Sequence, residues 1–284
     1  MLIFKKRNDL KTYLKEQKSN GKKIGFVPTM GALHEGHIFL VQSSRKENDI
    51  TVVSIFVNPT QFNDPEDFKK YPVTIESDIY KLELNQCEVL FLPSVEEIYP
   101  EGEDNMEHFE LGYLETVLEG KFRPGHFQGV CKVMKRLLNI VEPHNLYMGQ
   151  KDYQQCMVVK KLIELLNLSL RLHICPTFRE PGGLAMSSRN LRLSPGQKES
   201  ALAIYKMLVF VKKGYKDKNF NELKEIAGNL LYQAGFNAID YIEIVNADNL
   251  ELLEKWDKKT PLVAVVAAFM GDVRLIDNMI LTNG

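Results

Sequence analysis

Short apolar runs alternate with amphipathic stretches along the first 176 residues of the chain. The apolar runs are continuous rather than alternating, which is typical of strands in a parallel sheet with helices on both faces. This pattern predicts an α/β fold, a Rossmann-like, doubly wound parallel sheet. The strands are expected at 23–28, 49–58, 87–93, 145–149 and 170–176, and the helices at 36–47, 74–86, 126–141 and 152–167.

The pattern changes after Pro176. A linker containing Gly, Pro and Ser covers 177–190, and a helix follows for which Ser194 is the expected N-cap and Gly214 lies beyond the end. A second helix ending near 235, a strand at 238–245 and a hairpin of two strands turning at 271–272 complete the chain. We predict two domains, 1–177 and 178–284, of which the second is a smaller α+β domain.

Composition narrows the class of protein. The 284 residues are 44% apolar and 26% charged, which is ordinary for a globular protein. The 36 Lys and Arg residues nearly balance the 37 Asp and Glu residues, which argues against overall charge as a means of binding nucleic acid or membranes. The N-terminus carries charges where a secretory signal needs an apolar segment, and the longest apolar run, 261–270, is too short to span a bilayer. We expect a cytoplasmic protein.

The four cysteines are widely spaced and form no C-x-x-C pair. They are predicted to be small buried side chains in a reducing compartment, not a disulfide framework or zinc ligands.

The stretch FVPTMGALHEGH, residues 26–37, joins the first predicted strand to the first predicted helix. A helix N-terminus in this position directs backbone N–H groups at anions, and Gly31 and Gly36 allow a ligand to approach the backbone. His34 and His37 are three residues apart, so both rings can face a bound phosphate. A metal site is disfavoured, because H-E-G-H lacks the H-E-x-x-H spacing and a third ligand. Taken alone, two ordinary loop histidines are an equally good interpretation.

A second stretch, LYMGQKDYQQ at 146–155, ends a strand and opens a helix. Lys151 offers a mobile positive charge for phosphate oxygens. Asp152 is equally explained as an N-cap or a ligand. Gln155 is suited to a polar substrate or to a solvated helix face.

Three further stretches contain polar residues suited to ligand binding. LAMSSRN, residues 184–190, places two hydroxyl groups before Arg189; such a triplet is commonly an ordinary polar loop, but it is the third phosphate-type element in one chain. FVNPTQF includes Gln61 and suits recognition of hydroxyl and amide groups. FRPGHFQGV places Arg123 and His126 before a helix, where either is equally explained as structural.

Taken together, PTMGALHEGH, FVNPTQF, FRPGHFQGV, GQKDYQQ and LAMSSRN, in this order and spacing, resemble the pantothenate synthetase family over essentially the whole chain. H-x-G-H alone would indicate only the wider nucleotidyltransferase superfamily. The resemblance implies an ATP-dependent ligase that condenses (R)-pantoate with β-alanine to pantothenate, AMP and pyrophosphate, with Mg²⁺ carried on the ATP phosphates. It also implies an enzyme-bound pantoyl adenylate and a place in pantothenate and coenzyme A biosynthesis.

The resemblance carries specific roles onto this chain. His37 matches the proton donor and His34 the other phosphate-facing histidine, and Lys151 and Arg189 are expected to stabilise charge with them. Gln61 matches a residue shared by pantoate and β-alanine, and Gln155 matches a second pantoate contact. The implied ATP-binding residues are Met30, Gly31, Ala32, Leu33, His34, Glu35, Gly36, His37, Gly149, Gln150, Lys151, Asp152, Phe178, Met186, Ser187, Ser188 and Arg189.

The chain departs from the family pattern in PTFREPGGL, where Phe178 and Gly183 occupy variable places. A contact to adenine through the Phe178 backbone would not depend on its side chain. The resemblance also implies a homodimer, to which the apolar strand near 49–58 could contribute. Residues 178–284 are expected to act as a lid that shields the adenylate from water.

Two rival functions remain open on the sequence. A nucleotidyltransferase that leaves AMP on its final product shares the H-x-G-H chemistry but has no need of Gln61 and Gln155. A non-catalytic nucleotide-binding module would bind ATP without releasing pyrophosphate. Product analysis separates the three.

Overall fold

The computed structural model describes residues 1–63, 65–102 and 107–282. The chain forms two compact units, the first made of 1–149 and 158–176 and the second of 150–157 and 177–284. By packing, the segment 150–157 therefore belongs with the C-terminal residues, and a domain boundary at residue 177 stays a prediction.

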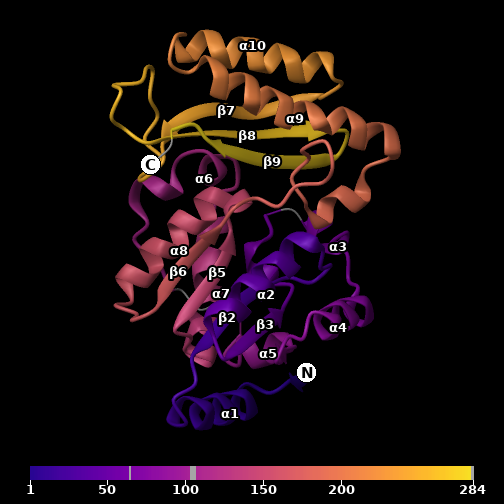
Figure 1. Ribbon diagram of the computed structural model, residues 1–284, viewed down its shortest axis with the longest axis vertical. Helices are drawn as coiled ribbons and strands as arrows, with labels where there is room; N and C mark the ends of the chain where they lie inside the picture. Colours follow the sequence, from indigo (N-terminus) through magenta and orange to yellow (C-terminus); the bar gives the residue numbers. More distant parts are fainter. Residues whose placement is uncertain (64, 103–106, 283–284) are drawn as a thin grey trace. The chain divides into compact units, whose positions relative to one another are not determined.

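A six-stranded, all-parallel sheet forms the centre of the first unit (Figure 1). Its strands are β1 (Leu2–Phe4), β2 (Ile24–Thr29), β3 (Ile50–Ile55), β4 (Val89–Phe91), β5 (Asn145–Gly149) and β6 (Arg171–Cys175), in the order β1-β4-β3-β2-β5-β6. The chain adds β3 and β4 on one side of β2 and later β5 and β6 on the other. The strand order thus reverses at β2, which is the place where sheets of this kind bind ligands.

Both faces of this sheet are buried. Val27, Val53 and Leu90 point to one face and pack with residues of α2 (Glu35–Glu47) and α4 (Ile75–Leu84). Their neighbours Phe26 and Val52 point to the opposite face and are also fully buried. The continuous apolar runs of the sequence follow from this two-sided burial.

The predicted elements of the first 176 residues are confirmed to within three residues at each end. In addition to α2 and α4, the long helices are α7 (His126–Val141) and α8 (Tyr153–Leu165). The pattern did not predict β1 or α1 (Arg7–Ser19), since the strand is only three residues long and the helix is strongly polar. Short elements also missed are η1 (Pro59–Gln61), α3 (Pro65–Lys69), α5 (Val95–Ile98), η2 (Gly112–Glu115), α6 (Glu119–Phe122), η3 (Gln150–Asp152) and η4 (Ser188–Arg192).

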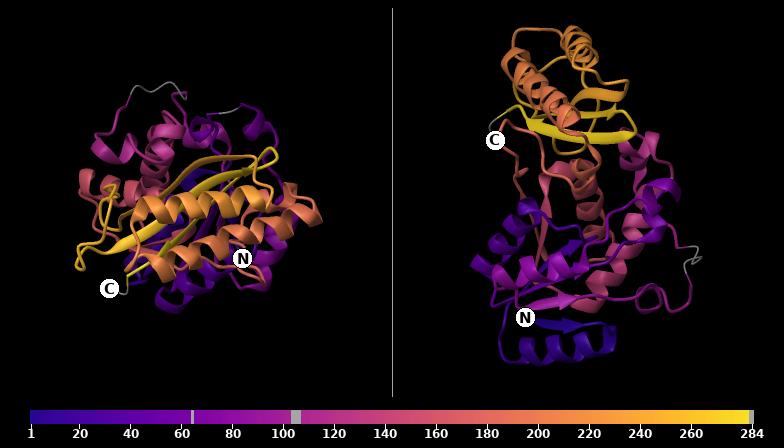
Figure 2. Two further views of the ribbon diagram at one scale, coloured as in Figure 1. Left: turned by 90° about the horizontal axis from the view of Figure 1, so that it is seen from above. Right: turned by 90° about the vertical axis from the view of Figure 1, so that its right-hand side faces the viewer.

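The second unit is built on an antiparallel sheet of β7 (Ala238–Asn246), β8 (Leu262–Met270) and β9 (Val273–Ile280), with β8 in the middle. Two helices, α9 (Pro195–Gly214) and α10 (Phe220–Gln233), cover one face of this sheet (Figure 2). Leu208, Leu223 and Val266 lie in the apolar core between them. The predicted α+β architecture and the hairpin at 271–272 are confirmed.

Two details of the prediction were wrong. Ser194 caps α9 as expected, but Gly214 is the last residue of the helix, and Tyr215 follows as its C-cap. The strand itself, Ile50–Ile55, faces no dimer surface, because β3 is buried at every position and pairs with β2 and β4 on its two sides; the homodimer stays a prediction.

The four cysteines are buried, as predicted. Burial raises the pKa of Cys87 and of Cys131 to about 12, so these thiols stay protonated at neutral pH. Among the described residues, no helix has both the length and the apolar character needed to cross a bilayer.

Candidate active site

A tight turn connects β2 to α2 and carries the first group of predicted site residues. Gly31 and Ala32 both adopt positive φ angles, of 85° and 48°, which bends the chain sharply after the strand. The Thr29 hydroxyl donates to the Ser54 carbonyl of β3 (2.7 Å) and accepts from the Gly31 N–H (3.2 Å). The turn is therefore fixed to the end of the neighbouring strand at the point where the strand order reverses.

Asp78 holds the same turn from α4. Its carboxylate accepts the backbone N–H groups of Ala32 (2.9 Å) and Leu33 (2.8 Å) and the Thr74 hydroxyl (3.0 Å). Asp78 is fully buried, so these bonds replace the hydration that its carboxylate has lost. Sequence reasoning missed this residue, although a carboxylate on the apolar face of helix 74–86, beside Ile75, Ile79 and Leu82, was a usable signal.

His34 and His37 cap the N-terminus of α2 reciprocally. The Gly36 N–H donates to Nδ1 of His34 (3.2 Å), and the His34 N–H donates to Nδ1 of His37 (3.3 Å). The two ring centroids are 4.1 Å apart, so the structure brings the rings together as the spacing predicted. Because each Nδ1 accepts a hydrogen bond, a neutral ring carries its proton on Nε2 and offers that N–H as a donor.

The residues after β3 bring Gln61 to Met30. The Gln61 amide donates to the Met30 sulfur (2.8 Å) and accepts from the Asn58 amide (3.2 Å). Asn58 is 1% exposed, and its side-chain oxygen accepts from the Tyr99 hydroxyl (2.8 Å). The side chain of the predicted substrate residue Gln61 is thus held by a buried, hydrogen-bonded asparagine. Gln61 also lies beside the turn predicted to bind the nucleotide.

The sequence left the role of His126 undecided, and in the structure this ring makes contacts within the protein. Its Nδ1 lies 2.7 Å from the Gln61 carbonyl, and its Nε2 lies 3.1 Å from the Arg123 guanidinium. Arginine can only donate, so Nε2 accepts and Nδ1–H donates to Gln61. Arg123 therefore orients His126, and His126 in turn holds the backbone carbonyl of Gln61, the predicted substrate-binding residue.

The second unit carries Lys151. Its ammonium group lies 3.6 Å from a carboxylate oxygen of Asp152, and its side chain is 17% exposed. Asn278 of β9 binds the backbone of this segment at Gln150 and Lys151. Gln155, the third residue of α8, is half-buried, and Gly149 ends β5 in the first unit.

The serine–arginine segment forms η4. The Ser187 hydroxyl caps it by accepting the Arg189 N–H (3.3 Å), while Ser188 is 7% exposed. The Met186 N–H donates to the Phe178 carbonyl (3.0 Å), so the structure joins two of the predicted ATP-binding positions. The Phe178 side chain is 40% exposed.

Gly183, the other departure from the family pattern, is explained by packing. It has a φ of 106°, and a Cβ atom there would lie 2.1 Å from the Tyr205 ring. The glycine therefore lets the linker lie against α9, and its effect is on loop shape.

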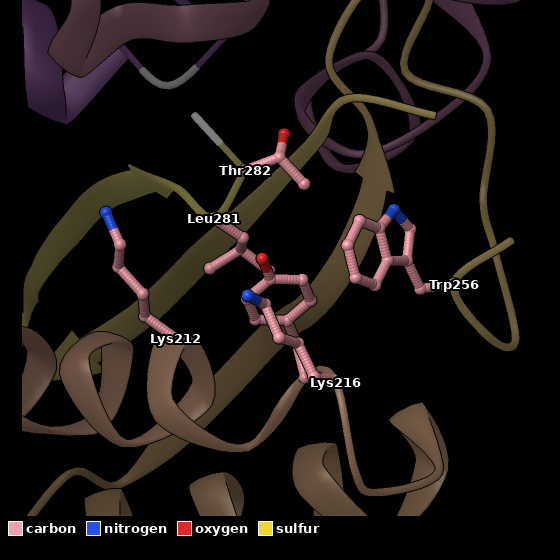
Figure 3. Close-up of a pocket in the computed structure, with 6 residues that line it drawn as sticks. Lys212, Lys216, Trp256, Leu281 and Thr282 are labelled. Carbon is pink, nitrogen blue, oxygen red and sulfur yellow. The ribbon is translucent and has the colours of Figure 1, made fainter. Parts of the chain in front are cut away.

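A cavity of about 360 Å³ in the second unit is lined by Lys212, Tyr215, Lys216, Trp256, Leu281 and Thr282 (Figure 3). The Lys216 ammonium lies 5.7 Å from the Tyr215 ring centroid and 5.9 Å from that of Trp256. The six residues include none of the predicted site residues, so this cavity is separate from the chemistry considered above.

Comparison with known proteins shows which family this chain belongs to. The sequence model of the pantoate-beta-alanine ligase family matches residues 2–280. A pantothenate synthetase from Azobacteroides pseudotrichonymphae is 46% identical over 284 residues, covering 98% of this chain and 99% of that protein.

Solved structures agree with these sequence matches. The crystal structure of pantothenate synthetase from Thermus thermophilus has a TM-score of 0.92 and 37% identity, with full coverage of both chains. Pantoate-beta-alanine ligase from Francisella tularensis, complexed with beta-gamma ATP and beta-alanine, has a TM-score of 0.83 and 39% identity, covering 100% of this chain and 99% of that one.

Proposed function

The chain belongs to the pantoate-beta-alanine ligase family and is a pantothenate-forming, ATP-using ligase, and we propose that it works through a pantoyl adenylate held by the residues described above. The observation that carries this proposal is the histidine pair at the start of α2. Two Nε2–H donors at a helix N-terminus, next to the reversal of strand order, suit the phosphates of a nucleotide.

The first step transfers AMP to pantoate. A carboxylate oxygen of pantoate forms a bond to the α-phosphorus of ATP, and the bond from that phosphorus to the pyrophosphate oxygen breaks. Negative charge grows on the α-phosphate and on the leaving pyrophosphate. His34 and His37 donate to these oxygens through Nε2–H, and Lys151 and Arg189 add positive charge. Donors that are already oriented stabilise such charge without reorganising.

The second step forms the amide. The amine of β-alanine attacks the acyl carbon of the adenylate, the carbon–oxygen bond to AMP breaks with its electron pair leaving on AMP, and the proton lost by the amine passes to water. The Gln61 amide binds pantoate and β-alanine, and Gln155 binds pantoate. Asn58 and His126 support Gln61 by fixing its side chain and its carbonyl.

Mg²⁺ enters with ATP in this proposal. Among the described residues, no group of three or more His, Cys, Asp or Glu side chains is placed to hold a metal ion. Mg²⁺ in nucleotide sites is commonly held by phosphates and water with few protein ligands, which fits this set of residues. When bound, the ion would neutralise phosphate charge. We assign no protein residue as its ligand.

The remaining ATP contacts are proposed on the motifs. The backbone of the turn 30–37, which includes the H-x-G-H element, and of the segment 149–152 would face the phosphates. Met186 to Arg189 would form the second phosphate loop, and a backbone group of Phe178 would contact adenine. A cytoplasmic location and a homodimer are proposed on the family resemblance; light scattering on the purified chain tests the dimer. The shielding role of residues 178–284 stays a prediction.

The test is ATP–pyrophosphate exchange measured with and without pantoate and in the absence of β-alanine. Exchange that requires pantoate supports a reversible acyl-adenylate step. Binding of ATP by a folded sample without exchange would contradict the two-step mechanism and favour a binding module. A stable adenylate as final product, with no free AMP on adding β-alanine, would favour an adenylyltransferase.

A further inference from the structure

Asn278, near the end of β9, makes an unusual set of contacts with the segment that carries Lys151. Its side-chain NH₂ donates to the carbonyl of Gln150 (2.8 Å) and to the carbonyl of Lys151 (2.9 Å). Its side-chain oxygen accepts from the Gln150 amide (3.0 Å). Both side-chain donors of Asn278 are therefore committed to this one segment. Asn278 is 2% exposed.

The geometry of these bonds fixes the position of one Cα atom. The Gln150 carbonyl belongs to the peptide plane before the Lys151 Cα, and the Lys151 carbonyl belongs to the plane after it. The Asn278 side chain thus holds the two peptide planes on either side of the Cα atom that carries the Lys151 side chain. No interaction of this kind is needed to close η3 itself, because a short 3₁₀ turn is closed by its own backbone.

Asp277 and Arg179 extend the network to the other predicted ATP segment. Arg179 donates to both carboxylate oxygens of Asp277 (2.6 and 3.0 Å), and the Asn278 N–H donates to the same carboxylate (2.7 Å). Arg179 also donates to the carbonyls of Gly183 (2.9 Å) and Asn278 (3.2 Å). The residue directly after Phe178 is therefore tied to the strand position that holds Lys151.

The Asp277 carboxylate is almost removed from water, whereas the Arg179 side chain is 20% exposed. Asp277 is 4% exposed, and burial raises the pKa of its carboxyl group, while the Arg179 guanidinium and the Asn278 N–H lower it. The Arg179 guanidinium also lies 4.8 Å from the Tyr205 ring centroid, which fixes its plane. The buried carboxylate, bound by both terminal nitrogens of Arg179 and by the Asn278 N–H, favours one arrangement, which holds Asn278 in one orientation.

We propose that Asn278 is a positioning residue that sets the place of the Lys151 ammonium, and that the Arg179–Asp277 pair orients Asn278 and links it to the Phe178 segment. This inference rests on the proposed role of Lys151 at the ATP phosphates. Small displacements of an oriented group cost large factors in rate, so Asn278 acts on catalysis without touching substrate.

The experiment is a double-mutant cycle on the full chain, read by pantoate-dependent ATP–pyrophosphate exchange. Asn278→Ala should lower the kcat of exchange at least tenfold and change the KM for pantoate less than threefold. Lys151→Ala should lower kcat about a hundred- to a thousandfold. In the Lys151→Ala background, Asn278→Ala should cost less than about twofold more, because the group that it positions is gone.

Asp240→Asn is the matched control. Asp240 of β7 pairs with Arg274, which like Asn278 lies on β9 (2.7 Å); the pair is more exposed than Asp277, with side-chain exposures of 18% and 19%, and belongs to none of the predicted site segments. It should lower thermal stability without lowering kcat. If Asn278→Ala does not fold, Asn278→Ser, which keeps one donor, replaces it in the cycle with an intermediate loss.

Two results would overturn the inference. One is wild-type kcat in a folded Asn278 variant, and the other is an equal loss in the presence and absence of the Lys151 side chain. A wild-type chain without pantoate-dependent exchange would instead remove the proposed function, and with it the role of Lys151 on which the inference depends.

Discussion

The turn that carries His34 and His37 and the segment that carries Lys151 are held in place differently. The two histidines cap the helix to which they belong, through bonds between residues two and three positions apart. Lys151 depends on Asn278, 127 residues further along the chain. The histidine geometry is thus mostly local, whereas the lysine geometry requires β9 to be in place.

The difference has a physical consequence. Local capping forms as soon as the helix forms and costs little chain entropy. A contact between residues so distant in sequence forms only with the completed sheet, so disturbance of β9 should reach Lys151 before it reaches the histidines. The following variants test that contrast, beginning with those expected to have the largest effect.

His37→Asn and His37→Gln separate the two functions of the ring. Asparagine places a polar atom near Nδ1, which preserves the cap, and glutamine places an N–H near Nε2. If Nε2–H is the phosphate donor, His37→Asn should lose about a hundred- to a thousandfold in exchange kcat, the loss also expected for His37→Ala, and His37→Gln should lose less. The reverse order would assign the activity to capping alone.

The same substitution at the N-cap sharpens this test. His34→Asn should retain thermal stability, because asparagine is a preferred N-cap, and should still lose activity. His108→Ala is the matched control, because that ring is largely exposed, with a side-chain exposure of 61%, and lies outside every predicted motif. Full activity in folded His34→Asn would remove His34 from the phosphate site.

Asp78→Asn tests how local the histidine turn is. The amide must direct either its NH₂ group or its single oxygen at the two N–H groups of Ala32 and Leu33, so one of them loses its acceptor. An unpaired buried donor costs about 1–3 kcal/mol, and we expect this loss in the free energy of unfolding in urea. Exchange kcat should fall about tenfold.

Asp217→Asn, on an exposed position of the second unit, is the control and should change neither quantity. Unchanged stability of Asp78→Asn would show that the capping histidines hold the turn unaided, and the contrast between the two segments would be complete. A large loss would show that even the histidine turn needs one distant anchor.

His126→Phe and His126→Asn test the support of Gln61. Phenylalanine keeps the ring and removes the donor to the Gln61 carbonyl, whereas asparagine keeps a donor near Nδ1. One neutral hydrogen bond is worth about 0.5–1.5 kcal/mol, so the KM for pantoate should rise about two- to tenfold in the phenylalanine variant and less in the asparagine variant. Equal KM values in both variants and the wild type would make His126 a packing residue only.

How far the sequence could predict these regions follows from the same contrast. The strands and the long helices after residue 23, and the closeness of the two histidine rings, are set by periodicity and by residues three positions apart, and these were predicted correctly. Asp78 and Asn278 were missed because their partners lie 45 and 127 residues away in sequence, and no local pattern encodes such pairs.

Signals for the missed residues were nevertheless present. Asp78 is a carboxylate on the apolar face of a helix, and Asp277 and Asn278 are adjacent polar residues in a strand whose other residues, except Arg274, are apolar. A buried polar side chain needs a partner, so each of these positions indicates a long-range bond without naming its target. The three-residue β1 had no such signal, because so short a run is not distinguishable from a loop by periodicity.

The smallest expected effect lies in a part of the first unit that carries neither segment. His173 of β6 stacks on Tyr147, with ring centroids 4.5 Å apart, and its Nε2 lies 2.9 Å from the Asn145 side-chain oxygen. Burial lowers the pKa of His173 below its ordinary value, Arg171 lowers it further, and Glu47 opposes this. As pH falls through the ordinary histidine pKa, the unfolded chain takes up a proton that the folded ring resists, so the free energy of unfolding falls.

His173→Gln keeps a donor near Nε2 and removes this titration. Urea unfolding measured from pH 7.5 down to 5.5 should therefore show a shallower loss of stability in the variant than in the wild type, with the two converging at the higher pH. Glu47→Gln should steepen the loss in the wild type, because the opposing charge is gone, and should have no such effect in His173→Gln. Exchange activity should be unchanged in every variant, because neither phosphate segment depends on β6. Parallel stability curves for wild type and His173→Gln would mean that burial of this ring contributes nothing to the pH dependence.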